Sequence, residues 1–214
     1  YVAPQTKASI SGVWDDLKLG IQAIFQHQGI KQLFLYAMVV TFFVMPVAIM
    51  FPLLTIEHYG GAKWEMSVVE IAWGVGMLVG GSLLGILRMP IAKIVLINSM
   101  YIILGLTFAL SGLFAPSWFI PFVFVTAVGG ISMSIFSAAF MTIIQEEIPQ
   151  HMLGRVFSLY FSIAILPSII GLLFTGLVAE AIGITTAFVI SGIFVCLVGI
   201  LSFYTAAMMR LGRK

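Results

Sequence analysis

Long apolar stretches separated by short polar segments run through most of the chain. Six of them reach the roughly 20 residues that a helix needs to cross a bilayer. They lie at about residues 33–56, 66–87, 91–114, 119–144, 156–179 and 184–208. Such lengths predict helices, because a lone strand in lipid would leave its backbone polar groups unpaired. The pattern therefore predicts an all-α membrane protein whose six-helix transmembrane bundle occupies residues 30–209.

The composition agrees with a lipid environment. The chain is 61% hydrophobic and 8% charged, whereas a soluble domain carries about 25% charged residues. So little polar surface could not cover a water-soluble globule, and membrane lipid is the expected partner of most of the surface. The chain begins with neither a methionine nor a signal-peptide pattern, so we expect a fragment of a longer protein.

Basic residues predict the orientation of the bundle. If six helices alternate in direction, nine of the ten cations fall on one side and only Lys63 falls on the other. The nine are Lys7, Lys18, Lys31, Arg88, Lys93, Arg155, Arg210, Arg213 and Lys214. The positive-inside rule then places both termini in the cytoplasm, with residues 210–214 as a basic tail. Trp64 and Trp118 are expected at the outer headgroup level, as parts of an aromatic belt.

Residues 1–29 are predicted to form a cytoplasmic linker that contains an amphipathic helix. Its apolar residues recur at helical spacing: Trp14, Leu17, Ile21, Ile24 and Phe25. One interpretation is a helix lying along the inner membrane surface. The alternative is a soluble linker helix that packs on a partner domain.

One acid, Glu70, lies within the second apolar stretch, "SVVEIAWGVGMLVGGSLLGIL". A charge at the bilayer centre costs about 2.5–3.5 kcal/mol on insertion scales, and an unpaired carboxyl group in apolar surroundings tends to hold a proton. At helical spacing Glu70 shares a face with Trp73 and Met77, which makes it a candidate for exchanging a proton against an apolar or cationic ligand. In the alternative, Glu70 reaches the outer interface towards Lys63 and only fixes the helix end.

Glycines in the same stretch predict close helix packing. Gly74, Gly81 and Gly85 lie on one side of the helix, and Gly76 and Gly80 lie on nearly the opposite side. Small residues let helix backbones approach each other in lipid. We therefore expect neighbouring helices on both flanks.

Prolines and polar residues suggest where a cavity could form. Pro46 and Pro52 interrupt the first span and Pro167 the fifth, and each favours a kink. Kinked spans can line cavities or act as hinges, and neutral kinks are also common. Besides Glu70, Trp73 and Met77, the candidate residues of a substrate cavity are Met45, Ser134, Ser137 and Met141.

The sequence offers no catalytic arrangement. His27, His58 and His151 lie outside the spans at scattered positions, and the single cysteine, Cys196, lies in an apolar run. We find no phosphate-binding loop, no cluster of metal ligands and no basic patch for nucleic acid. The sequence therefore predicts neither an enzyme nor a bound cofactor or metal, and any transport would draw on an ion gradient or on the substrate's own gradient.

Three segments resemble a known family. "MPVAIMFPLLTIEHYGGAKWEMSVVEIAWGVGMLVGGSLLG" resembles helices seven and eight of a major facilitator superfamily transporter. "EEIPQHMLGRVFSLYFSI" is similar to the loop between helices ten and eleven, and "GLVAEAIG" to the end of helix eleven. The resemblance covers residues 11–210, and the branch it resembles is the macrolide-efflux type of drug:proton antiporter.

The resemblance implies the C-terminal half of a twelve-helix protein of a bacterial cell (inner) membrane. Its partner would be the missing N-terminal six-helix half, and a small amphiphilic substrate would bind between halves that rock, with inward proton flow driving export. Glu70 matches the acid of helix eight. Glu146, Glu147 and Arg155 would sit in an inner loop that changes contacts during rocking, or form a solvated charged turn.

The chain departs from the family in one signature. The loop "LRMPIAK" keeps Arg88 but lacks the acid of the family's Gly–Asp–Arg pattern, which puts a charge-relay gate there in doubt. Two isolated halves could also pair as a homodimer. The alternative functions are export of a siderophore or another metabolite, and a non-transporting scaffold or assembly module.

Overall fold

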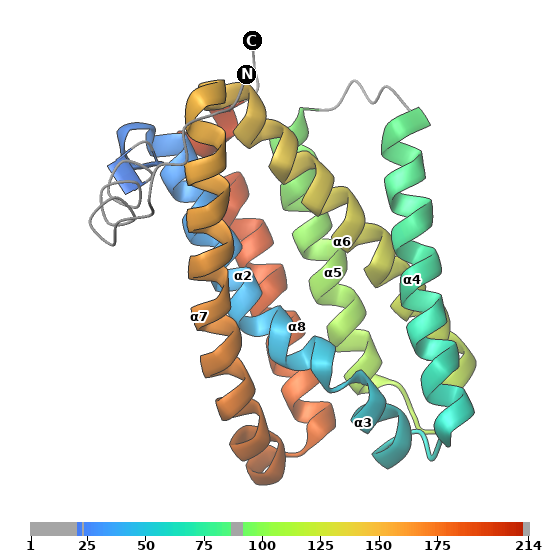
Figure 1. Ribbon diagram of the computed structural model, residues 1–214. Coiled ribbons are helices and arrows are strands. Elements are labelled where there is room, and N and C mark those ends of the chain that lie inside the picture. The colour runs from blue at the N-terminus through green and yellow to red at the C-terminus, as the bar shows by residue number, and fades with distance from the viewer. Residues whose placement is uncertain (1–20, 23, 87–91, 212–214) are drawn as a thin grey trace, which may run out of the picture.

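The computed structural model describes residues 21–22, 24–86 and 92–211. Most of the predicted linker helix, Arg88 and the end of the basic tail lie outside these residues. The elements are α2 Gln28–Ile49, α3 Phe51–Glu57, α4 Lys63–Ile86, α5 Lys93–Leu113, α6 Phe119–Glu147, α7 Gln150–Ile182, α8 Ile184–Phe203 and the short 3-10 helix η1 Met208–Arg210 (Figure 1). The described residues contain helices and no strands, so the all-α prediction is confirmed for them.

Five of these helices are long and apolar enough to cross a membrane within the part of the chain that the structure describes: α2, α4, α5, α6 and α8. The 33-residue helix α7 contains the predicted stretch 156–179. The helices extend the predicted spans by up to six residues at some ends and shorten them at others, because hydropathy does not mark where helical backbone stops. Six spans and cytoplasmic termini remain predictions.

The predicted first span, residues 33–56, consists of two helices in the structure. Helix α2 ends at Ile49, and Met50 adopts φ −89° and ψ −1° before α3 begins at Phe51. Pro52 lies at the start of α3, where a residue without a backbone N–H is tolerated. The interruption expected at Pro52 is thus present, as a change from one helix to the next.

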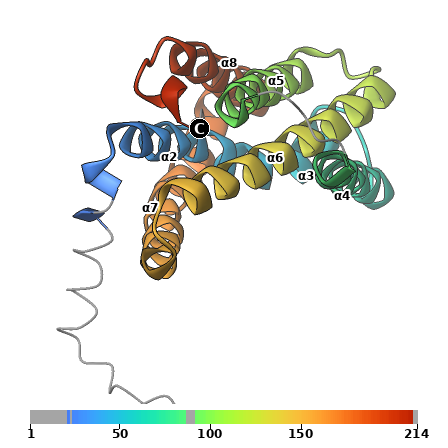
Figure 2. The same ribbon diagram turned by 90° about the horizontal axis from the view of Figure 1, so that it is seen from above.

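Helices α5 and α8 lie side by side (Figure 2), and glycines bring their backbones into contact. A Cβ atom on Gly105 would lie 2.6 Å from the Gly192 carbonyl oxygen, and one on Gly112 would lie 2.4 Å from the Thr185 carbonyl oxygen. Only glycine permits this approach, and the spacing of seven residues between Gly105 and Gly112 keeps both on one helix face. The helices α5 and α8 therefore pack closely along one face.

The pair α4–α6 is packed in the same way. A Cβ atom on Gly76 would lie 2.1 Å from the Ala127 carbonyl oxygen, and one on Gly80 would lie 2.6 Å from the Ile131 carbonyl oxygen. On the other flank of α4, a Cβ atom on Gly74 or Gly85 would meet no atom within 4 Å, and one on Gly81 would lie 3.3 Å from the Ser134 Oγ atom. Among the described residues, backbone contact therefore occurs on one flank of α4, and the other flank has a single side-chain neighbour at Gly81.

Hydrogen bonds fasten the connection between α3 and α4, at what we call the α3 end of the bundle. The Tyr59 hydroxyl donates to the Ser111 carbonyl oxygen at 2.7 Å, and His58 Nε2 lies 2.8 Å from the Phe114 carbonyl oxygen. Trp64 lies in the first turn of α4 at this end and is largely exposed; its place at the outer headgroup level stays a prediction. These bonds fix α3 against the end of α5.

Candidate functional site

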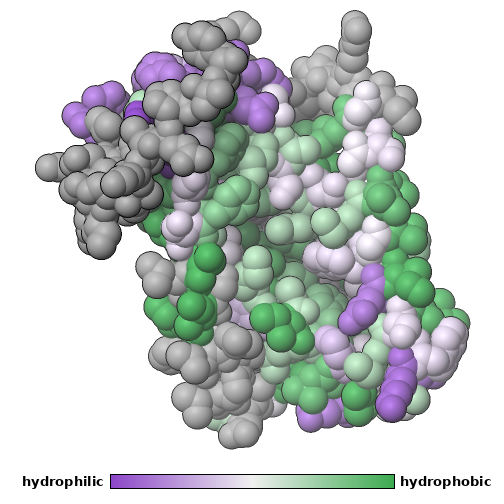
Figure 3. Space-filling model, viewed as in Figure 1, coloured by the Kyte–Doolittle hydropathy of each residue, from purple (hydrophilic) through white to green (hydrophobic). Residues whose placement is uncertain are grey.

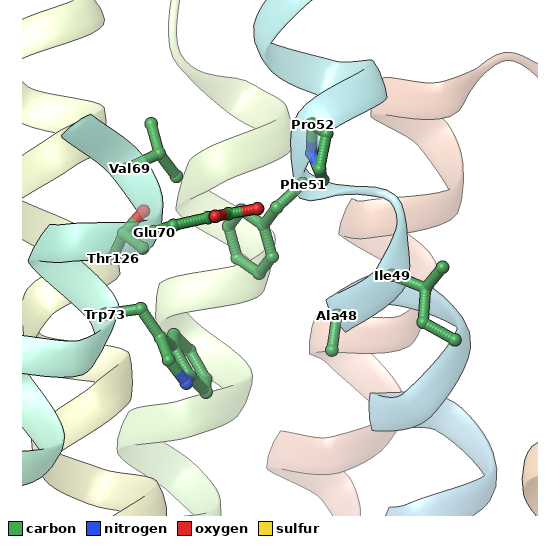
Figure 4. Close-up of a pocket in the computed structure, with 8 residues that line it drawn as sticks. All are labelled: Ala48, Ile49, Phe51, Pro52, Val69, Glu70, Trp73 and Thr126. Atoms are coloured by element: carbon green, nitrogen blue, oxygen red, sulfur yellow. The ribbon is translucent and has the colours of Figure 1, made fainter. Parts of the chain in front are cut away.

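A pocket of about 300 Å³ lies beside the break between α2 and α3 (Figure 4). Four elements meet there: the end of α2, the start of α3, the first turns of α4 and the N-terminal part of α6. Its lining residues are Ala48, Ile49, Phe51, Pro52, Val69, Glu70, Trp73 and Thr126. The break supplies half of this lining, so the pocket depends on the interruption of the first span.

Glu70 is the charged residue of the pocket lining. Its side chain extends from α4 towards Phe51 and Pro52 (Figure 4). Its carboxylate makes no hydrogen bond and no ion pair in the described part of the chain, and Lys63 at the start of the same helix is not its partner. An ion pair between Glu70 and Lys63 is therefore not seen; the Glu70 side chain is exposed, and a position at the outer interface stays the alternative.

Trp73 forms an aromatic wall of the pocket. Its ring centroid lies 5.9 Å from that of Phe51 and 6.4 Å from that of Phe108, with the Phe108 ring nearly parallel to it. Phe51 in turn lies 5.1 Å from Phe188 and 6.0 Å from Phe122. Mutual ring contacts of this kind hold side chains in fixed positions, so the apolar wall is preformed.

Thr126 is the remaining polar residue of the lining. Its hydroxyl donates to the Phe122 carbonyl oxygen one turn earlier at 2.9 Å, so its proton is used within α6. The pocket therefore offers one carboxylate, aromatic faces and one side-chain donor without a partner in the described structure, the Trp73 indole N–H. Such a site suits a ligand that is cationic or apolar.

The structure brings together only two of the residues predicted for a substrate cavity, Glu70 and Trp73. The other five lie outside the pocket lining: Met45, Met77, Ser134, Ser137 and Met141. Met77 lies one turn beyond Trp73, and Ser134 Oγ is 3.3 Å from the Cβ position of Gly81. The lining residues missed from the sequence are Ala48, Ile49, Phe51, Pro52, Val69 and Thr126, and only the proline in this group gave a signal.

The charged residues predicted for a gating loop lie at the end of the bundle opposite to the α3 end, where α6 ends and α7 begins. Glu146 forms an ion pair with Lys93, which joins the last turn of α6 to the first turn of α5. Glu147 ends α6, and Arg155 lies in the second turn of α7, with its Nη1 atom 3.8 Å from the Met152 sulfur. This ion pair links two helices of the same bundle.

The surface agrees with a chain surrounded by lipid. On the face in Figure 3, hydrophilic side chains gather mostly towards the ends of the helices, and apolar ones cover much of the stretch between them. No group of three or more metal-ligating side chains occurs among the residues that the structure describes.

The chain is similar in sequence to several known bacterial proteins. The chain is 34% identical over 185 residues to macrolide efflux protein A of Streptococcus pyogenes, which covers 86% of this chain and 46% of that protein. It is 34% identical over 157 residues to macrolide efflux protein A of Enterococcus faecalis, covering 73% of this chain and 49% of that protein. An uncharacterized MFS-type transporter, YfiS of Bacillus subtilis, is 26% identical over 168 residues, with 76% and 40% covered. The chain thus spans about half the length of the curated relatives it matches.

These matches agree with the long apolar helices of the fold. Residues 33–210 match the Major Facilitator Superfamily, and this range includes both the pocket and the glycine-packed helix pairs. The chain is a multi-pass membrane protein and belongs to the Major Facilitator Superfamily, a family of transporters.

Proposed function

We propose that this chain is the C-terminal half of a proton-coupled exporter of amphiphilic drugs such as macrolides. Two relatives are named as macrolide efflux proteins, and the chain spans 46% and 49% of their lengths. The other half would be an N-terminal six-helix bundle that closes the cavity from the opposite side. The two halves rock about the bound substrate and expose it to each side of a bacterial cell membrane in turn.

The observation that carries the proposal is the exposed Glu70 carboxylate, which has no ion pair or hydrogen bond among the described residues, in a mostly apolar pocket at a helix break. A single carboxylate can hold a proton or a cationic group, but not both. Binding of one ligand therefore weakens binding of the other, which is the reciprocal coupling that exchange requires. Protons entering from outside would release the drug, and drug binding from inside would release the proton.

The remaining predicted residues receive roles in this proposal. Substrate too large for the pocket would reach the neighbouring surfaces of α2, α4 and α6, which carry Met45, Met77, Ser134, Ser137 and Met141. Glu146, Glu147 and Arg155 would lie at the cytoplasmic side, together with both termini, and would change contacts as the halves move. Pairing of two isolated halves as a homodimer is the alternative to pairing with an N-terminal half.

Drug export driven by an imposed pH gradient tests the proposal. The whole transporter, with this chain joined to its N-terminal half, is placed in liposomes, and macrolide movement is followed for wild type and Glu70→Gln. Glu65→Gln is the matched control, because Glu65 lies on the same helix and only caps its first turn through the Ala62 N–H. We expect export to follow the gradient in wild type and Glu65→Gln and to collapse in Glu70→Gln at equal protein level.

Two results would contradict the proposal at different points. Undiminished gradient-driven export by Glu70→Gln would move the proton site to the other half. Absence of macrolide export by the wild type would favour a siderophore or other metabolite as substrate, or a non-transporting scaffold.

A further inference from the structure

The pocket is small and carries a single charge. Its volume of about 300 Å³ is at the lower end of the roughly 300–1,000 Å³ found for sites of drug-sized ligands. It can therefore hold one group of a larger molecule and not the whole of it. The question is which chemical group fits one carboxylate set among Phe51, Pro52, Val69 and Trp73.

We propose that this pocket is the subsite for an alkylated ammonium group of an amphiphilic cation, with Glu70 as its counter-charge, and that Trp73, seated on Gly129, sets the size of the group accepted. Only the role of this subsite in transport rests on the proposed function; binding of the ammonium group does not.

The lining favours this group over other ligands. Glu70 repels an anion, and one carboxylate is too few ligands for a divalent metal ion, which takes about six oxygen atoms. A neutral polar group would find only the Trp73 indole N–H as a free side-chain donor of the lining, because the Thr126 hydroxyl already donates to the Phe122 carbonyl oxygen. An alkylated ammonium pairs its charge with the carboxylate, and its alkyl groups contact the aromatic faces, which attract cations.

Two adjacent glycines of α6 set the position of Trp73. A Cβ atom on Gly130 would lie 2.2 Å from the Trp73 carbonyl oxygen, so the α4 backbone rests directly against α6 there. A Cβ atom on Gly129 would lie 2.9 Å from Cζ3 of the Trp73 indole and 3.1 Å from the Thr107 Oγ1 atom. The indole lies back against α6 because Gly129 has no side chain.

A side chain at position 129 would move the indole towards the ligand. Phe51 and Phe108 contact the Trp73 ring, and both are buried, so the neighbouring core has no space for a displaced indole. The pocket is the free space that borders the ring. Gly129→Ala should therefore push the end of the indole into the pocket and exclude the larger alkylammonium groups first.

The charge is tested by direct binding without a pH gradient. The whole transporter in lipid nanodiscs is titrated with benzyltrimethylammonium and with its neutral isostere, in which a quaternary carbon replaces the nitrogen. We expect the cation to bind about tenfold or more tightly than the isostere, because its charge is attracted by the carboxylate and by the aromatic faces. Glu70→Gln should remove this preference and Glu65→Gln should keep it. Equal binding of the two probes by the wild type would overturn the subsite.

The size limit is tested with benzyltriethylammonium, which carries three additional methylene groups. Gly129→Ala should weaken its binding by about tenfold more than that of the trimethyl probe, since one methylene in a fitted pocket changes affinity by roughly tenfold or more. Trp73→Phe in the Gly129→Ala background should restore the wild-type ratio, and Trp73→Phe alone should favour the triethyl probe. The single Trp73→Phe variant keeps the test decisive if Gly129→Ala does not fold.

Gly105→Ala is the control for general loosening of the bundle. Its Cβ atom would lie 2.6 Å from the Cys196 sulfur in the α5–α8 contact, and neither residue lines the pocket. It should lower stability and keep the wild-type ratio of the two probes. Trp73 does not set the size limit if Gly129→Ala keeps the wild-type ratio of triethyl to trimethyl probe affinity. The same conclusion follows if Gly105→Ala changes this ratio as much as Gly129→Ala does. A transporter that binds in the expected pattern but moves no macrolide would contradict the proposed function and leave the subsite standing.

Discussion

Gly76→Ala tests the attachment of α4, the helix that carries Glu70 and Trp73. Only 17% of the most apolar stretch of α4 is buried, against 61% for α5, so α4 depends on its contact with α6. The new Cβ atom would lie 2.1 Å from the Ala127 carbonyl oxygen, more than 1 Å inside the 3.4 Å at which ordinary contacts begin. No rotamer change relieves a clash with backbone, so the two helices must move apart.

Overpacking of this kind costs about 1–3 kcal/mol. For a domain of this size each kcal/mol lowers the melting temperature by roughly 2–4 °C, so a cost of about 2 kcal/mol corresponds to roughly 4–8 °C. The loss is measured as the temperature at which the purified transporter leaves its monodisperse peak on size-exclusion chromatography. Macrolide binding should weaken as well, because the movement displaces the three lining residues of the pocket that lie on α4.

Gly85→Ala is the matched control on the same helix. Its Cβ atom meets nothing within 4 Å in the described structure, and alanine favours helix over glycine by about 1 kcal/mol. Its melting temperature should equal or exceed that of the wild type. If Gly76→Ala melts as high as Gly85→Ala, the backbone contact between α4 and α6 does not hold α4 in place, and the reasoning fails.

Three further outcomes are expected. Tyr59→Phe should lower the free energy of unfolding by about 1 kcal/mol, because it removes the hydrogen bond to Ser111. Burial raises the pKa of the Tyr59 hydroxyl, so the folded state holds this proton more tightly than the unfolded state. The wild type should therefore lose more stability than the variant as the pH rises above about 10. A double-mutant cycle of Lys93→Met and Glu146→Gln should give a coupling energy below about 1 kcal/mol, since the ion pair is exposed. Gly183→Ala should cost about 1–2 kcal/mol and lower the melting temperature, because residue 183 has φ +83° between α7 and α8.

Local features of the chain were readable from the sequence. Apolar length fixes where a helix can span lipid, and the helical period places Trp73 three residues after Glu70 on one face. The closely packed flank of α4 was also predictable, since Gly76 and Gly80 recur at four residues. Each of these depends on neighbours within one or two turns, which a sequence displays directly.

Tertiary structure decided which residues surround Glu70. Phe51 and Thr126 reach the pocket from other helices, and the break at Met50 that admits Phe51 was expected only as a kink. Gly129 gave no signal of its own, because its role depends on the Trp73 indole arriving from α4. The physical reason is that lipid and protein core are both apolar. Hydropathy along a membrane helix therefore cannot distinguish the face that meets lipid from the face that packs on a neighbour, and only the assembled bundle selects the partner of each face.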